Sequence, residues 1–479
     1  ELVSHLPVDL GVPYVVVQHL SPNYRSMLVQ LLARETTMEV REVEEGLVPQ
    51  PDTLYITPPN NDLVLVEDRF HLVKPGSDVV PKPSVNRFFT SLAEDRGEDV
   101  IGVILSGTGS DGASGTRAIK AGGGLVFAQD PATAKYTGMP QAAISTQCVD
   151  WVLSPKDIAR EIAVTVRTQG ALAPAARDAE APATLKTLLT RVHRHTRVDF
   201  SDYKENTVWR RVLRRIAANR LNSLEAYIQF AEGHPDELNQ LCREILISVT
   251  SFFRDRNAFN ALRDAMAERF RIKRAGDEIR IWVPGCATGE EAYTIAILIC
   301  ELLGHTRHEF KIQIFATDID TNAMAVARRG VYPASTLADL EPGLIQRYFT
   351  PSGDAYEVTK SLRELVVFAR QDLAQDPPFL RLDLISCRNV LIYFQSPLQE
   401  RVLGAFHYAL APGGLLFLGK SESVFQREEL FDSLDREGKI FLRCATTSKA
   451  PSFILASINR EPRQALRRER EKTAEEQFL

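Results

Sequence analysis

Residues 279–291 read IRIWVPGCATGEE and decide the fold of the C-terminal half of the chain. The run IRIWV is typical of a buried strand, and a helix is expected from Glu290 onward. The loop between them is bracketed by Gly285 and Gly289, whose missing side chains let backbone approach a ligand closely. This order predicts a binding position at the carboxyl end of the strand, although a glycine loop alone also fits a simple tight turn.

The order of strand and then helix is repeated further along the sequence. IQIFAT precedes a helix expected from Thr321, LDLISC forms another strand, and the turn PGG leads into the strand LLFLG. Such alternation predicts an α/β fold with a doubly wound parallel sheet. Between residues 347 and 369, the runs RYF, AYEVT and LVVFA predict three short antiparallel strands inserted as a small β-subdomain.

Asp318 follows the strand IQIFAT and suggests what the glycine loop binds. An acidic side chain at this place accepts hydrogen bonds from two ribose hydroxyls, so loop and acid together predict a nucleoside ligand. Nicotinamide cofactors and S-adenosylmethionine (SAM) both fit this pairing. The segment LAPGGLLFLG, residues 410–419, resembles the hairpin that adds a final antiparallel strand in class I SAM-dependent methyltransferases, which favours methyl transfer.

The N-terminal half predicts a second α/β domain that ends at a linker. Short strand-like runs alternate with helical stretches at residues 14–17, 53–57, 63–66, 100–105, 125–128 and 151–153. Residues 170–184, GALAPAARDAEAPAT, are rich in Ala and Pro and predict a surface linker. Residues 185–248 then show apolar positions at helical spacing without a strand signal, which predicts a small all-α domain.

Composition limits the class of protein. The 479 residues are enough for about two to four domains, and 44% hydrophobic with 25% charged residues is ordinary globular composition. The net charge of −5 provides no global basic field for nucleic acid or anionic membranes. Six scattered cysteines without a CxxC pair or a Cys/His cluster predict reduced thiols in the cytoplasm and no metal site. No apolar run approaches the roughly 20 residues of a membrane helix, so no membrane insertion is expected.

Four motifs in order give the C-terminal half a specific resemblance. They are TSFFR (250–254), GCATGEEAYT (285–294), FATDID (315–320) and CRNVLIYF (387–394). Together they closely resemble the chemotaxis receptor methyltransferase family, CheR. The resemblance implies a helical domain at 185–248 and a SAM-dependent methyltransferase domain at 249–446, with the β-subdomain at about 347–369. It implies methylation of glutamates on chemoreceptor cytoplasmic helices, with S-adenosylhomocysteine as product.

The resemblance also implies which residues form the site. By it, SAM would contact Thr250, Arg254, Gly285, Glu291, Asp318, Asp372, Leu373, Asn389 and Val390; position 372 is Asn in the family's enteric members. Arg254 and Tyr393 would lie at the reaction centre, where the guanidinium orients a carboxylate; the alternatives are a surface ion pair for Arg254 and a core aromatic for Tyr393. A glutamate, with an ordinary pKa of about 4.3, is ionised at pH 7 and needs no general base, so catalysis is mostly alignment.

One helix of the expected all-α domain has a basic face. On the side opposite its apolar face, this helix carries four arginines: Arg210, Arg211, Arg214 and Arg215. Such a face is often only solvated, but receptor methylation helices are glutamate-rich, and four arginines suit docking against them. Nucleic acid is the competing partner, which the acidic net charge and the lack of interleaved aromatics disfavour.

The N-terminal half carries a second resemblance. VVVQHLSP contains His19, ILSGTGSDGASG (104–115) contains Asp111, and GMPQAAI covers 138–144. Each alone fits a turn or a structural histidine, but together, over residues 1–169, they resemble the chemotaxis receptor methylesterase family, CheB. That family uses a Ser-His-Asp triad, so His19 would be the general base and Asp111 would orient its imidazole.

The nucleophile of that triad is expected upstream of residue 1. Ser4 and Ser21 lack the exposed strand-to-helix turn that a nucleophilic serine needs. Ester hydrolysis is therefore not expected from the chain as given.

We therefore predict a cytoplasmic signal-transduction protein, with a CheB-like domain fused to a SAM-dependent protein-glutamate O-methyltransferase. Fusion would raise the local concentration of two antagonistic activities at one substrate. Two alternatives stay open: a signalling scaffold without turnover, and a methyltransferase for another protein, a small molecule or RNA. The charged tail, residues 447–479, predicts a terminal helix or a coiled-coil stalk.

Overall fold

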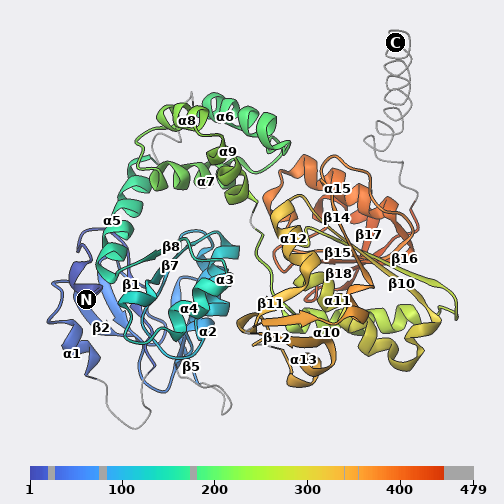
Figure 1. Ribbon diagram of the computed structural model, residues 1–479, viewed down its shortest axis with the longest axis horizontal. Helices are drawn as coiled ribbons and strands as arrows, with labels where there is room; N and C mark the ends of the chain where they lie inside the picture. The colour runs from blue at the N-terminus through green and yellow to red at the C-terminus, as the bar shows by residue number, and fades with distance from the viewer. Residues whose placement is uncertain are drawn as a thin grey trace. The chain divides into compact units, whose positions relative to one another are not determined.

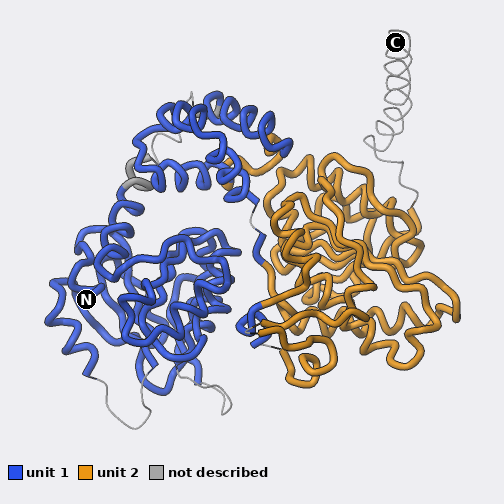
Figure 2. The backbone as a smooth tube through the Cα atoms, viewed as in Figure 1, with its two compact units in different colours: residues 1–199, 208–249, 333–339 blue, residues 200–207, 250–332, 340–479 orange. Residues whose placement is uncertain are grey.

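The computed structural model describes residues 1–19, 27–74, 83–172, 181–246, 248–338, 340–353 and 355–446. The chain divides into two compact units (Figure 2). The first comprises residues 1–199, 208–249 and 333–339, and the second comprises 200–207, 250–332 and 340–479. Ser21 and the predicted C-terminal tail lie outside the described residues. Within the described part, no helix has both the length and the apolarity to cross a membrane.

The N-terminal part of the first unit is the α/β domain that the sequence predicts. One parallel sheet has the order β1-β3-β2, with β1 at Tyr14–Val16, β2 at Glu39–Glu42 and β3 at Thr53–Ile56. A second has the order β6-β7-β8, with β6 at Ile101–Ile104, β7 at Leu125–Gln129 and β8 at Trp151–Leu153. β4 (Asp62–Val66) and β5 (Arg69–Val73) form an antiparallel hairpin. All five residues of β7 are buried, as expected for a central parallel strand.

Helices α1 (Leu28–Leu32), α2 (Val85–Arg96), α3 (Ala113–Gly122), α4 (Gly138–Ser145) and α5 (Pro155–Leu172) accompany these strands. The all-α domain follows with α6 (Ala181–Thr196), α7 (Glu205–Ala218), α8 (Leu224–Gly233) and α9 (Pro235–Ile245). Both ends of the predicted linker are helical instead, since α5 continues to Leu172 and α6 starts at Ala181; residues 173–180 lie outside the described residues. Alanine is the strongest helix former, which explains why an Ala-rich segment extends the two helices.

The second unit is built on a seven-stranded sheet with the order β14-β10-β9-β15-β16-β18-β17. Its strands are β9 (Glu278–Pro284), β10 (Lys311–Asp318), β14 (Val366–Arg370), β15 (Leu382–Cys387), β16 (Leu410–Leu418), β17 (Phe431–Asp435) and β18 (Ile440–Arg443). The first five are mutually parallel, and β18 pairs antiparallel with both β16 and β17. Helices α10 (Arg256–Phe270), α11 (Glu290–Leu303), α12 (Thr321–Arg329) and α15 (Ser396–Ala409) belong to this unit; Figure 1 shows the sheet between α15 and α11. The predicted doubly wound sheet is confirmed.

Two strand predictions were wrong in detail. The run LVVFA, assigned to the β-subdomain, forms β14 and pairs with β10 at the edge of the main sheet. The β-subdomain instead has the order β11-β13-β12, from β11 (Val331–Pro333), β12 (Phe349–Ser352) and β13 (Ala355–Val358). The LAPGGLLFLG segment forms β16, which is parallel to β15, and the antiparallel strands follow it. A local apolar pattern identifies a strand but not the strand it pairs with.

Candidate functional site

The glycine loop lies at the carboxyl end of β9, where the sequence places it. Gly285 has φ of +68° and Gly289 of +96°, conformations that favour glycine. A Cβ atom on Gly285 would lie 2.4 Å from Cγ2 of Val390, so a larger residue is excluded there by contact. The same contact brings Gly285 and Val390, both predicted to bind SAM, against each other.

Asp318 ends β10 and points to this loop. Its Oδ2 accepts a hydrogen bond of 2.8 Å from the backbone N–H of Ala287, and its Oδ1 accepts one of 2.9 Å from Asp320 N–H. Ala287 has φ of +47°, unusual for a residue with a side chain. Burial raises the pKa of Asp318 above its ordinary value, partly offset by these backbone hydrogen bonds. The predicted pairing of glycine loop and acid is present in the structure.

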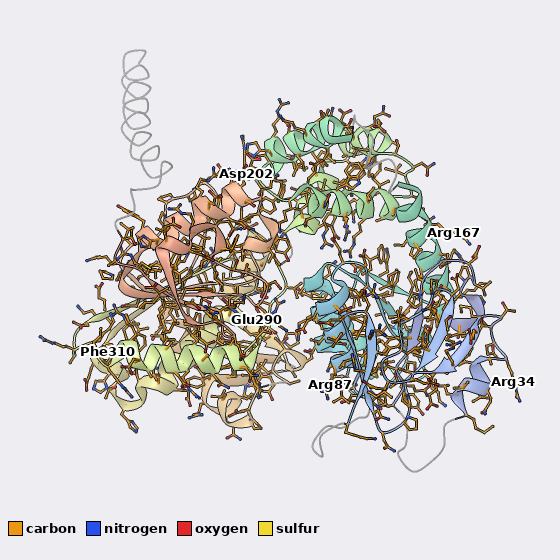
Figure 3. All side chains as sticks on the ribbon, turned by 180° about the vertical axis from the view of Figure 1, so that it is seen from behind. Arg34, Arg87, Arg167, Asp202, Glu290 and Phe310 are labelled. Atoms are coloured by element: carbon orange, nitrogen blue, oxygen red, sulfur yellow. The ribbon has the colours of Figure 1, made fainter. Side chains whose placement is uncertain are left out.

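Glu291 lies in the first turn of α11 and joins the glycine loop to the end of β15. Figure 3 labels its neighbour Glu290, at which α11 begins. Glu291 Oε1 accepts a hydrogen bond of 2.6 Å from Oγ of Ser386, and Nη1 of Arg388 lies 3.7 Å from Oε2. Burial raises the pKa of Glu291, an effect that the charge of Arg388 opposes.

Arg388, which the sequence analysis did not single out, fixes the segment carrying Thr250 and Arg254. Its side chain is fully buried, and its guanidinium lies over the rings of Phe259 and Phe417, at 5.0 and 4.7 Å from their centroids. Nη1 donates to the carbonyl oxygen of Arg254 at 2.9 Å. An arginine directly after the fully buried strand β15 was the available signal, because a buried guanidinium needs several fixed partners.

The CRNVLIYF motif supplies one wall of the site. Asn389 has φ of +58°, and Leu391–Tyr393 form a short 3-10 turn. Leu373, Val390 and Tyr393 are partly buried and pack against one hydrophobic cluster of the second unit. Tyr393 therefore makes the contacts expected of a core aromatic residue. It also lies on the motif that touches the glycine loop.

Asp372 is engaged within its own loop. Its Oδ1 accepts a hydrogen bond of 2.9 Å from Ala374 N–H, and its backbone N–H donates to Asp376 Oδ2 at 2.7 Å. These bonds set the course of the loop that carries Leu373.

The groups at the carboxyl ends of β9, β10, β14 and β15 fit SAM. Asp318 provides a carboxylate for ribose hydroxyls, Gly285 leaves room for close backbone approach, and Leu373 with Val390 offers apolar surface. No group of three or more His, Cys, Asp or Glu side chains in the described part of the chain is placed to hold a metal ion.

The first unit brings the predicted His19 and Asp111 together. His19 Nε2 lies 2.8 Å from Asp111 Oδ2. Asp111 also accepts hydrogen bonds from the N–H groups of Val85 (2.8 Å) and Asn86 (2.9 Å) at the start of α2. Burial alone would raise the pKa of Asp111, but the hydrogen bonds from His19 and this backbone lower it. Ser4 is exposed and bonds to Glu1 O at 2.9 Å within its own turn.

The open basic face expected on α7 is not formed, because two of its four arginines are buried. Arg211 and Arg214 are 3% and 5% exposed. Arg214 pairs with Asp150, Arg211 Nη1 donates to Gly123 O at 2.9 Å, Arg210 pairs with Glu98, and Arg215 pairs with Glu237. The apolar face of α7 is buried as predicted, but neighbouring acidic and carbonyl groups of the same unit cover the opposite face.

Comparison with known proteins agrees with this geometry. Residues 1–162 match the model of the CheB methylesterase family, 183–246 that of the CheR methyltransferase all-alpha domain, and 248–440 that of the CheR SAM-binding domain. An uncharacterised 104.1 kDa protein of Rhodobacter capsulatus is 36% identical over 438 residues, which cover 86% of this chain and 46% of that protein. This chain thus spans about half the length of that relative.

Two further proteins match one half each. Chemotaxis protein methyltransferase 2 of Pseudomonas aeruginosa is 34% identical over 250 residues, covering 51% of this chain and 88% of the relative. The crystal structure of the Thermotoga maritima CheB methylesterase catalytic domain has 32% identity, covers 34% of this chain and 87% of that chain, and gives a TM-score of 0.32. The chain belongs to the CheR family of SAM-dependent chemotaxis methyltransferases, with a CheB methylesterase domain fused ahead of its helical and SAM-binding domains.

Proposed function

We propose that the chain is a protein-glutamate O-methyltransferase whose substrates are glutamates on the cytoplasmic helices of chemoreceptors. The observation that carries this proposal is the convergence of the glycine loop, Asp318 and the Asn389–Tyr393 motif at one edge of the sheet. SAM, when bound, supplies a methyl group on a sulfonium. The residues of the chain have to bind that cofactor, align the acceptor carboxylate and exclude water.

The acceptor needs alignment more than activation. A receptor glutamate is already ionised at pH 7, since its ordinary pKa is about 4.3, so no side chain has to remove a proton. Proximity and orientation alone supply up to roughly 7–11 kcal/mol of a barrier. Arg254 would orient that carboxylate. The hydrogen bond from Arg388 to its carbonyl oxygen and the left-handed conformations of Phe253 and Asp255 support this role, because they fix the backbone that carries it.

The first unit supplies the second part of the proposal. His19 would act as general base and Asp111 as its orienting carboxylate in hydrolysis of glutamate methyl esters. Ser4 is held in an exposed turn by Glu1 and lacks the surroundings of a nucleophile. Hydrolysis of methylated receptor, measured as methanol release, is therefore not expected to depend on Ser4.

Methyl transfer is tested with methyl-labelled SAM and membranes that carry chemoreceptors of the same organism. We expect label on the receptor that is released by mild base, as glutamate methyl esters are. Asp318→Ala and Arg254→Ala should abolish it, while Asp264→Ala, at an exposed carboxylate of α10, should leave it unchanged. Binding of SAM without any label on receptor would overturn the proposal, and would favour a scaffold or another acceptor.

A further inference from the structure

Glu422 lies between β16 and the 3-10 segment Phe425–Leu430, and is 4% exposed. Its carboxylate accepts four backbone hydrogen bonds. Oε2 accepts from Asn389 N–H at 2.9 Å and Gly419 N–H at 2.6 Å. Oε1 accepts from the N–H groups of Val390 and Leu391, both at 2.8 Å. The sequence motifs predict no role for this residue.

The three consecutive N–H groups of residues 389–391 converge because Asn389 adopts a left-handed conformation, with φ of +58°. Successive N–H groups arranged in this way form a concave anion-binding nest. Here the anion is a side chain of the protein itself. A buried carboxylate with four donors is well compensated for the loss of water, whereas four N–H groups without it would be left unsatisfied.

The turn held by Glu422 is the one that contacts the glycine loop. Val390 fills the space beside Gly285, where a Cβ atom would lie 2.4 Å from Cγ2. Leu391 begins the 3-10 turn that ends with Tyr393. A shift of the turn would therefore move an apolar wall of the cofactor site and the aromatic ring expected at the reaction centre together.

We propose that Glu422 is a positioning residue for SAM binding and methyl transfer. Its carboxylate holds residues 389–391 against the glycine loop and acts through their backbone rather than by touching substrate. The inference rests on the proposed function, since the site it organises is the proposed methyltransferase site.

Glu422→Gln tests the inference in the full chain with almost no change of shape. A carboxamide presents two N–H donors where the carboxylate has an acceptor, so donors would face donors at one pair of N–H groups. Losing these bonds should weaken binding of S-adenosylhomocysteine by about 10- to 100-fold, measured by isothermal titration calorimetry. In the methylation assay the KM for SAM should rise by a similar factor while the KM for receptor stays unchanged. Glu437→Gln, at an exposed turn between β17 and β18, is the matched control.

Gly419→Ala approaches the same contact from the other side. A Cβ atom at this position would lie 2.8 Å from Glu422 Oε2 and 2.9 Å from Asn389 N, so the carboxylate must move away from the turn. Weakened cofactor binding is expected here too, which keeps the test decisive if Glu422→Gln does not fold.

The outcomes separate the two proposals. If both variants bind S-adenosylhomocysteine as tightly as the wild type, the positioning role is overturned and the proposed methyltransferase function is not. Cofactor binding that falls as expected, with no methylation of receptor by the wild-type chain, would support the positioning role and overturn the receptor as acceptor. An equal loss of receptor affinity and cofactor affinity would contradict the inference and indicate a general loss of folding.

Discussion

Asp318 is a partly buried carboxylate at the centre of the site, and its raised pKa has a consequence for binding. Ribose hydroxyls donate to the ionised form, so binding of the cofactor favours ionisation. As the pH falls towards the raised pKa, protonation of Asp318 competes with binding of the cofactor, so the affinity for the cofactor should fall. Calorimetry at successively lower pH, from neutral down towards the ordinary aspartate pKa of about 3.9, should show this loss in the wild type.

Asp318→Asn is the control for that pH dependence. It should bind about 10-fold more weakly at neutral pH and lose less affinity on acidification, because the titrating group is gone. Glu291 also has a raised pKa and titrates in both proteins, so the difference between the two profiles isolates Asp318. Identical profiles would contradict the assignment of Asp318.

Arg388 holds residues of the site in place, and its replacement should lower the free energy of unfolding. Arg388→Ala would leave Glu291 buried without its nearby cation, at roughly 3–5 kcal/mol of unfolding free energy. Arg388→Lys keeps the charge but cannot lie flat over two rings and reach the carbonyl of Arg254. In denaturant unfolding the wild type should be the most stable, Arg388→Lys less stable and Arg388→Ala the least stable. An unchanged unfolding midpoint for Arg388→Ala would refute the supporting role.

Sequence motifs predicted the side chains expected to face a ligand better than those that hold them in place. The motifs correctly bring together Asp318, Gly285 and Val390 in the second unit. They also bring together His19 and Asp111 in the first. The supporting residues, Arg388 and Glu422, were missed. Their partners lie on other segments of the chain, and the structure supplies the contacts that reveal them.

At the scale of elements, α7 shows what periodicity can and cannot predict. Its apolar spacing correctly identified the buried face, but no periodic pattern shows that another element covers the opposite one. β14 gives the same lesson, since LVVFA was recognisable as a strand while its partner β10 lies far away in sequence. The role of the α7 arginines in docking a receptor helix stays a prediction.

Arg215 links three helices of the all-α domain through Glu237. Nε and Nη2 of Arg215 donate to the two oxygens of Glu237, both at 2.8 Å, and Tyr227 donates to Oε1 at 2.7 Å. Arg215→Ala should destabilise the domain by about 3–5 kcal/mol, because Glu237 stays buried without its cation. Arg210→Ala, whose side chain is 47% exposed, should cost only about 0–1 kcal/mol. Equal losses in thermal or denaturant unfolding would contradict this ranking.

At the scale of the whole molecule, the all-α domain belongs to the same compact unit as the CheB-like domain. Arg214 of α7 pairs with Asp150 beside β8, while Lys120 of α3 lies 2.5 Å from the same carboxylate. Arg214→Glu would place like charges together in a buried position. Hydrogen exchange should then increase in α7 and β8, whereas Arg210→Glu, at the more exposed side chain, should have a smaller effect. No change for Arg214→Glu would show that this pair does not join the domains.

Tandem mass spectrometry of a chemoreceptor incubated with this chain and SAM would detect methylation of its glutamates. We predict the mass increment of one methyl group on glutamate side chains of the cytoplasmic helices, lost after mild base and absent with Asp318→Ala. Methyl groups on another residue type, or unmodified receptor while calorimetry shows the chain saturated with cofactor, would contradict the account.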